Sequence, residues 1–247
     1  MHDPIVAAAE RIRRARRLTV LTGAGVSAAS GVPTFRGADG LWRSFRPEEL
    51  ATPGAFRRDP RVVWEWYDWR RQLIAACRPN AAHEVLARWS RRVPDSTLVT
   101  QNVDGLHERA GTSRVLRLHG SIWHVRCARP CSAGGTRHDD RVPLPEIPPR
   151  CACGALLRPG VVWFGESLPA DVVRQASDAT ARCDVFLAIG TSAVVYPAAG
   201  FIDEARAAGA TTIEINPEAT GASDGVDLVV RQPAEIALPE IDRLLQE

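Results

Sequence analysis

The chain has 247 residues, of which 31 are basic and 29 acidic, so the formal net charge is only +2. Every basic residue other than histidine is arginine. This near balance excludes the strong basic footprint of a nucleic-acid-binding or membrane-surface protein. No apolar run is long enough to span a bilayer. The length suits one large α/β domain that carries insertions.

The first seventeen residues have apolar side chains at helical spacing, which predicts a surface helix. These side chains are Ile5, Val6, Ala9 and Ile12. The segment lacks the basic region, apolar stretch and cleavage site of a secretion signal, so we expect a cytoplasmic protein. Six cysteines in such a compartment are not expected to form disulfides.

A glycine-rich stretch follows a short apolar run, residues 18–21, which predicts a buried strand. Three small residues fit the G-x-G-x-x-G/A dinucleotide pattern: Gly23, Gly25 and Ala28. Glycines there permit a tight turn and leave room for a pyrophosphate. The N–H groups of the next helix, around Ala24 and Ser27, would face the phosphates. The alternative is a tight turn that binds no ligand.

The helix after these glycines is predicted to be very short, because Gly31 and Pro33 interrupt it. A Thr-Phe-Arg-Gly segment follows where an ordinary dinucleotide fold has its second strand. It predicts a loop that closes over a cofactor and reaches Trp42, with phosphate and nicotinamide contacts from Thr34, Phe35 and Arg36. At these residues the sequence resembles the sirtuin family, the NAD-dependent protein lysine deacylases.

Residues 38–79 are predicted to be helical and are rich in tryptophan. Tyr67 and Arg70 lie three positions apart and therefore share a helix face. A phenol beside a guanidinium suits a small carboxylate, although an ordinary amphipathic helix explains the same spacing. The pair also resembles the Tyr-x-x-Arg motif with which class III sirtuins recognise succinyl and malonyl groups on lysine.

A second helix is predicted over 80–92, and a buried strand over 96–100. That strand delivers Gln101, Asn102 and Asp104 to its carboxyl end, where ligands sit in open α/β sheets. Gln101 and Asn102 can bind a ribose or a water, and Asp104 can accept from a carboxamide. The alternative is a polar helix cap. The Thr-Gln-Asn-Val-Asp-Gly-Leu-His string matches the cofactor motif of sirtuins.

A further strand is predicted over 115–118, and His119 follows it. An imidazole titrates near neutrality and can take a proton from a ribose hydroxyl, whereas a lone histidine at a strand end can also be structural. The Leu-His-Gly string matches the catalytic histidine of the sirtuin family, and the resemblance therefore implies a general base at His119.

Residues 121–159 show no long apolar periodicity but contain four cysteines, Cys127, Cys131, Cys151 and Cys153. Two pairs on either side of a loop suggest a structural zinc site with four thiolate ligands. The spacings C-x-x-x-C and C-x-C depart from the usual C-x-x-C of sirtuins. A metal-free loop, or replacement of one thiol by His124 or His138, are the alternatives.

The segment 157–166 is apolar and extended in the prediction. Such a segment can pair edge-on with a peptide, and its sirtuin counterpart lines the acyl-lysine tunnel, which implies Val162 and Phe164 as substrate contacts. A plain core strand explains the same residues.

Two α/β units complete the chain, with strands predicted near 183–189, 211–215 and 227–230. The first ends in small residues, and the second in a polar pair suited to the adenosine ribose. The cofactor residues that the resemblance implies here are Gly190, Thr191, Ser192, Asn216, Glu218 and, near the adenine, Ala234.

Together these features predict a doubly wound parallel sheet, Rossmann-like and NAD-binding, with a small inserted helical and zinc-binding part. The predicted ranges are 1–37, 80–120 and 160–247 for the large part, and 38–79 and 121–159 for the small one. The resemblance implies an NAD-dependent lysine deacylase acting on acyl-lysine proteins or peptides, with NAD as co-substrate and Zn²⁺ as structural metal. We expect a monomer. An ADP-ribosyltransferase or NAD hydrolase, and a non-catalytic NAD-sensing or zinc-scaffold protein, are the alternatives.

Overall fold

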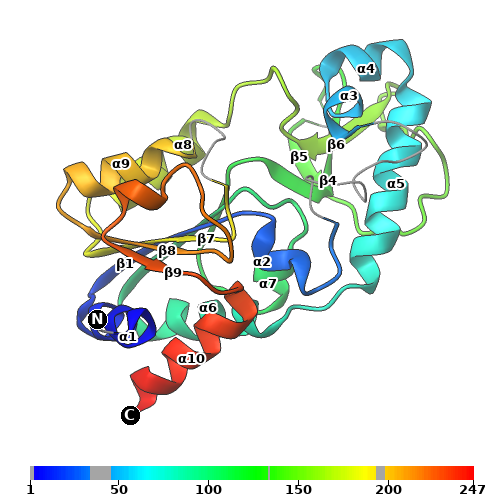
Figure 1. Cartoon of the computed structure of the whole chain (residues 1–247). Coiled ribbons are helices and arrows are strands. Elements are labelled where there is room, and N and C mark those ends of the chain that lie inside the picture. Colours follow the sequence, from blue (N-terminus) through cyan, green and yellow to red (C-terminus); the bar gives the residue numbers. More distant parts are fainter. Residues whose placement is uncertain (1–2, 34–45, 133, 193–197) are drawn as a thin grey trace.

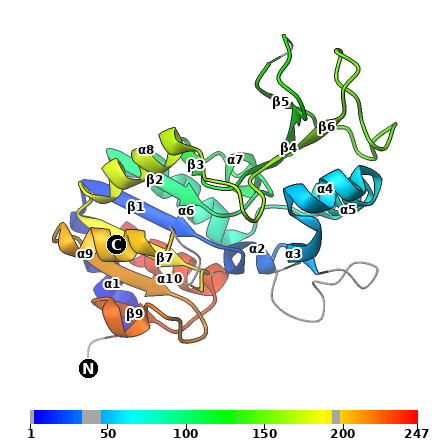
Figure 2. The same ribbon diagram turned by 90° about the horizontal axis from the view of Figure 1, so that it is seen from above.

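The computed structural model describes residues 3–33, 46–132, 134–192 and 198–247. Two β-sheets lie in different parts of the molecule, one with six strands and one with three (Figures 1 and 2). The larger sheet is parallel throughout and helices cover both of its faces. The predicted fold class, a doubly wound parallel sheet with a smaller inserted part, is therefore confirmed.

The six-stranded sheet has the order β3-β2-β1-β7-β8-β9, which reverses direction between β1 and β7. Ligands of open α/β sheets bind at the carboxyl ends of the strands beside such a reversal. The strands span Arg17–Thr22 (β1), Asp95–Thr100 (β2), Val115–Arg117 (β3), Val185–Ile189 (β7), Thr211–Ile215 (β8) and Leu228–Val230 (β9).

Helices on the two faces bury the sheet, which explains why β7 is apolar along its whole length. One face is covered by α1 (Pro4–Arg14), α6 (Ala81–Arg92) and α10 (Ala234–Gln246), and the other by α8 (Ala170–Thr180) and α9 (Gly200–Ala207). Side chains of β1 alternate accordingly: Leu18 and Val20 pack toward α1, α6 and α10, and Leu21 toward α8 and α9.

The predicted N-terminal helix is present as α1. The Asp3 side chain caps it by accepting from the Ile5 N–H at 2.9 Å. Ile5, Ala9 and Ile12 are buried in the core, whereas Val6 is 41 % exposed. The helix therefore lies at the surface and buries one apolar stripe against the sheet.

The smaller part combines helices α3 (Pro47–Leu50), α4 (Pro53–Arg58) and α5 (Pro60–Ala76) with strands β4 (Gly120–Cys127), β5 (Thr136–His138) and β6 (Leu157–Val161). The strands form an antiparallel sheet in the order β5-β4-β6. The sequence shows no regular apolar pattern over most of these strands, because a register shift between Gly120 and Val125 interrupts the alternation in β4.

Aromatic side chains of α5 fill the core of the smaller part, where Trp64 and Trp66 pack with Ile122 and Leu157. Trp163 also belongs to this core, although the predicted ranges return the chain to the large part at residue 160. The exact boundaries between the two parts stay a prediction.

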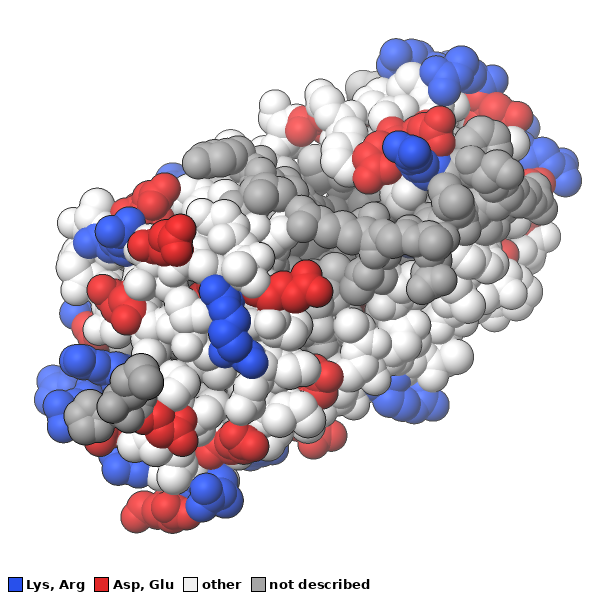
Figure 3. All heavy atoms as spheres, in the orientation of Figure 1, with Lys and Arg blue, Asp and Glu red and all other residues white. Residues whose placement is uncertain are grey.

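The molecular surface carries both signs of charge. On the face in Figure 3, arginine and acidic side chains lie interspersed at the two ends of the molecule. Among the residues that the structure describes, no helix combines the length and the hydropathy required to cross a membrane.

Candidate active site

Two loops cross where the sheet order reverses. The Gly23 N–H donates to the Ile189 carbonyl at 3.1 Å, and the Gly25 N–H donates to the Gly190 carbonyl at 2.9 Å. A Cβ at Gly23 would lie 2.7 Å from the Gly190 oxygen, and one at Gly25 2.8 Å from the Gly190 Cα. The missing side chains thus make room for the neighbouring loop. Cofactor binding by these glycines stays a prediction.

The helix after the glycines is short, as expected: α2 spans Gly25–Ala28, with Ala24 at its N-cap. Gly31 follows with a φ of +85°, a left-handed conformation that favours glycine. Ser27 is 1 % exposed and faces the loop that follows β2. Four residues predicted to contact the cofactor lie outside the described residues: Thr34, Phe35, Arg36 and Trp42.

The loop after β2 places Gln101 and Asn102 beside this crossing. The Asn102 Nδ2 donates to the Gly23 carbonyl at 3.0 Å and to the Ser27 Oγ at 3.2 Å. Both amide hydrogens are thereby used, so the Oδ1 atom remains to accept from a ligand. The Gln101 Nε2 donates to the Thr191 Oγ1 at 2.9 Å and ties the ends of β2 and β7 together.

Asp104 lies behind this surface and is 3 % exposed. Its carboxylate accepts from the Leu106 N–H at 2.8 Å, at the start of α7 (Leu106–Arg109), and from the Ser27 hydroxyl at 2.8 Å. Burial raises the pKa of Asp104, although the two hydrogen bonds oppose the rise. The structure shows the carboxylate holding Ser27 and the start of α7. Its predicted contact with a carboxamide is untested.

His119 follows β3 and has a defined tautomer. Its Nδ1 lies 3.0 Å from the Gln101 backbone carbonyl. A carbonyl oxygen only accepts, so Nδ1 carries the hydrogen and Nε2 keeps a free lone pair. Burial lowers the pKa of His119, although the bond to Gln101 opposes this, and the imidazole is therefore neutral at pH 7. This arrangement suits a general base.

The loops after β7 and β8 complete the edge of the sheet. The Asn216 Nδ2 donates to the Thr191 carbonyl at 3.0 Å. Gly190 has a φ of +56°, and a Cβ there would lie 2.6 Å from the Val26 nitrogen, so the same crossing requires glycine on both loops. Ser192, next to Thr191, is half-buried.

The two remaining cofactor candidates lie toward the outer strands. Ala234 is 4 % exposed and begins α10, as the sequence predicts. Glu218 is exposed, and its backbone carbonyl accepts from Arg231 at 2.9 Å. Arg231 also pairs with the buried Glu214 at 3.1 Å, and this anchor of the loop is not indicated by any sequence pattern.

The segment after β6 connects His119 to α5. The Val162 N–H donates to the His119 carbonyl at 2.9 Å. The Trp163 indole N–H donates to the Tyr67 hydroxyl oxygen at 3.0 Å. The extended backbone ends at Val161, earlier than predicted, and Phe164 is 55 % exposed in the turn that follows. Val162 and Phe164 thus lie on a segment that is anchored by hydrogen bonds to His119 and to Tyr67 of α5.

Tyr67 and Arg70 lie on one face of α5, as the spacing predicts. The Arg70 guanidinium carbon is 4.9 Å from the centroid of Trp66 and 5.8 Å from that of Tyr67. Burial raises the pKa of Tyr67 to about 12, so the phenol keeps its hydrogen. Trp163 donates to the Tyr67 oxygen, which leaves that hydrogen to donate elsewhere. Arg70 stays charged although burial lowers its pKa. The pair can therefore bind a carboxylate.

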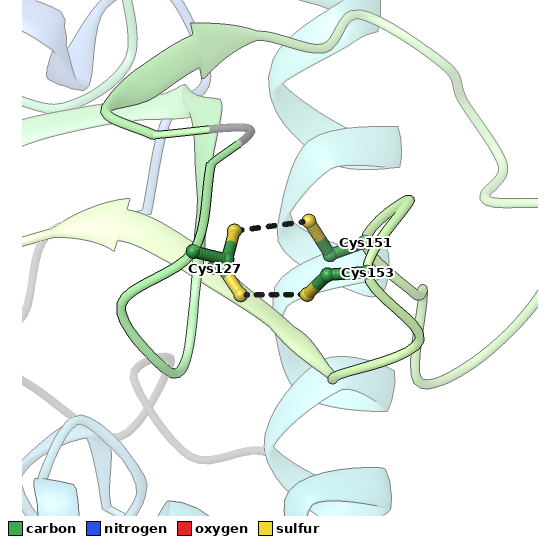
Figure 4. A group of neighbouring side chains, drawn as sticks. Cys127, Cys151 and Cys153 are labelled. Carbon is green, nitrogen blue, oxygen red and sulfur yellow. Dashed lines mark hydrogen bonds between the residues drawn. The ribbon is translucent and has the colours of Figure 1, made fainter.

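Four thiols meet between two loops of the smaller part (Figure 4). The Sγ atoms of Cys127 and Cys153 are 3.6 Å apart, those of Cys131 and Cys151 are 3.8 Å apart, and all four lie within 4.8 Å of one another. Tetrahedral Zn²⁺ with Zn–S bonds of about 2.3 Å separates its sulfur ligands by about 3.8 Å. The irregular spacings therefore do not prevent a four-thiolate site, and the cluster fits structural Zn²⁺.

The two histidines considered as substitute ligands lie elsewhere. His124 and His138 are partners across β4 and β5, with ring centroids 5.7 Å apart. The metal-ligand group found in the described part of the chain contains cysteines only. Replacement of a thiol by either histidine is thus not what the structure shows.

A second set of polar side chains in the smaller part has no signal in the sequence. Arg71 is fully buried on α5, and its Nε donates to the Ile122 carbonyl of β4 at 2.9 Å. Its Nη1 lies 3.6 Å from the Asp139 carboxylate. Asp68, also on α5, accepts from the Leu144 N–H at 2.7 Å. These contacts fix the loop over 139–144 to the helix that carries Tyr67 and Arg70.

Comparisons with known proteins show the family of the chain. The model of the Sir2 family matches residues 23–197. The NAD-dependent protein deacylase of Aquifex aeolicus is 52 % identical over 231 residues, which cover 93 % of this chain and 95 % of that protein.

Solved structures of Sir2 homologues also resemble this chain over nearly its whole length. A Sir2 homologue in complex with NAD superposes with a TM-score of 0.90 at 46 % identity and covers 97 % of this chain and 93 % of that one. A mutant Sir2 homologue in complex with 2′-O-acetyl-ADP-ribose gives a TM-score of 0.91 at 45 % identity, over 100 % of this chain and 97 % of that one. Because the family match covers most of the chain and the relatives align almost end to end, the chain belongs to the Sir2 family, the sirtuins.

Proposed function

We propose that this protein is an NAD-dependent protein lysine deacylase of the class III type, which removes succinyl and malonyl as well as acetyl groups. The observation that carries the proposal is the His119 tautomer: a neutral imidazole with a free Nε2, at the edge of the sheet where ligands of this fold bind. The names of the relatives, NAD-dependent protein deacylases, support the same reaction class.

NAD would supply the ribosyl carbon that receives the acyl oxygen as nicotinamide leaves. In this proposal His119 accepts a proton at Nε2 from a ribose hydroxyl, and Gln101 keeps the imidazole oriented through its backbone carbonyl. The Asn102 Oδ1 accepts from a ribose hydroxyl or an ordered water, since Gly23 and Ser27 occupy the amide hydrogens. One water is consumed in releasing the amine, and the products are free lysine, nicotinamide and O-acyl-ADP-ribose.

The residues proposed to hold NAD line the carboxyl edge of the parallel sheet from β2 to β9. Thr191 lies at their centre, since it accepts from Gln101 and Asn216. The full set in the described part is Gly23, Ala24, Gly25, Ser27, Gln101, Asn102, Asp104, Gly190, Thr191, Ser192, Asn216, Glu218 and Ala234. The close loop crossing fits this role, because it brings the ends of β1 and β7 together without intervening side chains at Gly23, Gly25 and Gly190.

The acyl group would extend from His119 past Val162 and Phe164 toward α5. Hydrogen bonds join this path at two points, from Val162 to His119 and from Trp163 to Tyr67. At its far end the Tyr67 hydroxyl and the Arg70 guanidinium meet a carboxylate on a succinyl or malonyl group. An acetyl group makes no such contact, so the pair favours acidic acyl groups.

Nicotinamide release from NAD tests the proposal, measured with matched acetyl-, malonyl- and succinyl-lysine peptides and with no peptide. We expect release that requires peptide and is fastest with succinyl or malonyl. Fastest release with acetyl would keep the reaction class and remove the role of Tyr67 and Arg70. Release that is independent of peptide would instead indicate an NAD hydrolase or an ADP-ribosyltransferase.

A further inference from the structure

The last residues of the two central strands β1 and β2 carry hydroxyls that face each other. Thr22 and Thr100 are partners in the parallel register, and their Oγ1 atoms are 2.8 Å apart. Thr22 is 0 % exposed and Thr100 2 %. Both side chains project to the face on which Val20 and Leu98 pack, two residues earlier in each strand. Apolar side chains fill that face elsewhere, so the paired hydroxyls are an exception.

His107 extends this pair into the helix α7. Its Nε2 lies 3.0 Å from the Thr22 Oγ1, and the side chain is 1 % exposed. The other ring nitrogen, Nδ1, has no hydrogen-bond partner among the described residues. Burial, and secondarily the neighbouring His83, hold the pKa of His107 well below its usual value, so the ring is neutral. A buried imidazole with one unsatisfied nitrogen costs stability, and an aliphatic side chain would avoid that cost.

The chain of hydrogen bonds ends at the candidate active site. The Thr100 Oγ1 accepts from the backbone N–H of Asn102 at 3.0 Å. A continuous series of hydrogen bonds thus runs from His107 through Thr22 and Thr100 to the backbone of Asn102, whose side chain is proposed to bind the ribose. The side-chain amide of Asn102 is held separately, by the Gly23 carbonyl and the Ser27 hydroxyl. Among the described residues, the Thr100 hydroxyl at the end of this series is the partner of the Asn102 backbone N–H.

We infer that His107 is a positioning residue, which holds Asn102 in place through the hydroxyls of Thr22 and Thr100. The inference rests on the proposed function for its catalytic consequence. This role explains why a histidine with an unsatisfied Nδ1 occupies position 107 instead of an aliphatic residue. The position requires a hydrogen bond to Thr22 rather than the best packing. A shift of Asn102 by a fraction of an ångström would misplace its Oδ1 relative to the ribose.

A pair of His107 variants tests this. Glutamine at position 107 can reach the Thr22 hydroxyl with either its amide nitrogen or its oxygen, whereas leucine fills the space without a polar atom. With a succinyl-lysine peptide, we expect His107→Leu to lower kcat by roughly ten- to a hundredfold and to leave the KM for NAD nearly unchanged. His107→Gln should recover most of the loss. A folded His107→Leu with wild-type kcat would overturn the inference, as would equal losses in both variants.

The threonines provide a second pair in case His107→Leu does not fold. Thr100→Ser keeps the hydroxyl that accepts from Asn102, and Thr100→Val removes it at nearly the same size. We expect a large loss of kcat in Thr100→Val only. Equal activity of the two folded variants would contradict the relay, that is, the series of hydrogen bonds from His107 through Thr22 and Thr100 to Asn102.

Hydrogen exchange at the backbone N–H of Asn102 separates this inference from the proposed function. The amide should exchange faster in His107→Leu and Thr100→Val than in the wild type, in the absence of NAD and peptide. If the wild type releases no nicotinamide, the proposed function fails while the exchange rates still report on the relay. Unchanged exchange at Asn102 in both variants would refute the relay even in an active enzyme.

Discussion

The parallel sheet and the smaller three-stranded part bury different kinds of side chain. Around the parallel sheet the two core clusters are mainly aliphatic, from Ile5 and Leu18 to Ile241. The smaller part instead combines aromatic residues of α5 with a fully buried arginine, Arg71, and four clustered thiols. Neither Nη atom of Arg71 makes a hydrogen bond to a described residue. Aliphatic burial holds the first part, and the second adds polar contacts and, we propose, a metal to its aromatic core.

This difference matters for function because each part supplies one half of the candidate site. The parallel sheet places His119 and Asn102 just after the ends of its own strands, so their positions follow from the buried core of the sheet. Tyr67 and Arg70 depend on α5, whose attachment to β4 and to the 139–144 loop runs through Arg71 and Asp68. Acyl selectivity should therefore be more sensitive to damage than the chemical step.

Metal removal is the strongest way to separate the two parts. Structural Zn²⁺ contributes about 10–16 kcal/mol to the folding of small zinc domains, so Cys151→Ser or a chelator should disorder the thiol loops. We expect faster hydrogen exchange in β4, β6 and α5, and unchanged protection in β1, β2, β7 and β8. Cys183→Ser, at a buried thiol against the parallel sheet, is the matched control and should retain one zinc per chain. Zinc-free wild-type protein with full protection would refute the metal site.

Substitution of His119, the proposed general base, should stop the reaction without unfolding either part of the molecule. His119→Ala is expected to lower kcat by roughly 10²- to 10⁴-fold, while calorimetry should show NAD binding largely retained. His124→Ala, at a half-exposed histidine of β4, provides the control and should keep wild-type kcat. Unfolding of His119→Ala would make that residue structural.

Acid should destabilise the parallel-sheet part through a buried histidine. Burial holds the pKa of His83 at about 4, below its ordinary value of 6.5, so the folded state resists protonation that the unfolded state accepts. Stability is thus fully present above pH 6.5 and is lost as the pH falls toward 4, by about 3 kcal/mol for this one group. Urea unfolding at several pH values measures the loss. His83→Gln should remove the share of this group and so reduce the dependence, while the buried His107 and the half-buried His119, whose pKa values are also lowered, keep the remainder.

Acyl preference gives the smallest and most selective effect. Arg70→Met removes a charge-assisted contact worth about 1.5–3 kcal/mol. We therefore expect kcat/KM for succinyl- and malonyl-lysine to fall roughly ten- to a hundredfold, with acetyl-lysine nearly unaffected. Arg61→Met serves as control, because Arg61 lies on the same helix but is exposed and pairs with Glu65. Equal losses for all three peptides would exclude a carboxylate contact.

Local patterns in the chain were sufficient to locate most elements and many site residues. The glycine turn after β1, the polar residues after β2 and the histidine after β3 each follow a buried apolar strand, and a parallel sheet gathers such strand ends at one edge. Four cysteines in one insertion indicate a metal whatever their exact spacing. The strands and the cysteine cluster are confirmed because each depends on a few neighbouring residues, and the roles of the other site residues stay predictions.

Contacts between distant segments were beyond the reach of the sequence. It could not show that Gly23 and Gly25 are needed because Gly190 crosses them. It did not indicate that Trp163 binds Tyr67, or that Arg71 is buried although Arg70 beside it is not fully so. Nothing in the sequence set His107 apart as the partner of Thr22.

The amino-acid sequence alone determined the kinds of chemistry available and their order along the sheet, because hydrophobic period and strand-end composition are local properties. The tertiary structure alone decided which nitrogen of His119 bonds to the Gln101 carbonyl and which groups occupy the amide hydrogens of Asn102. It also decided that four irregularly spaced thiols converge. Each of these depends on a hydrogen-bond partner or a neighbour far away in the chain, and such pairings exist only once the backbone has folded.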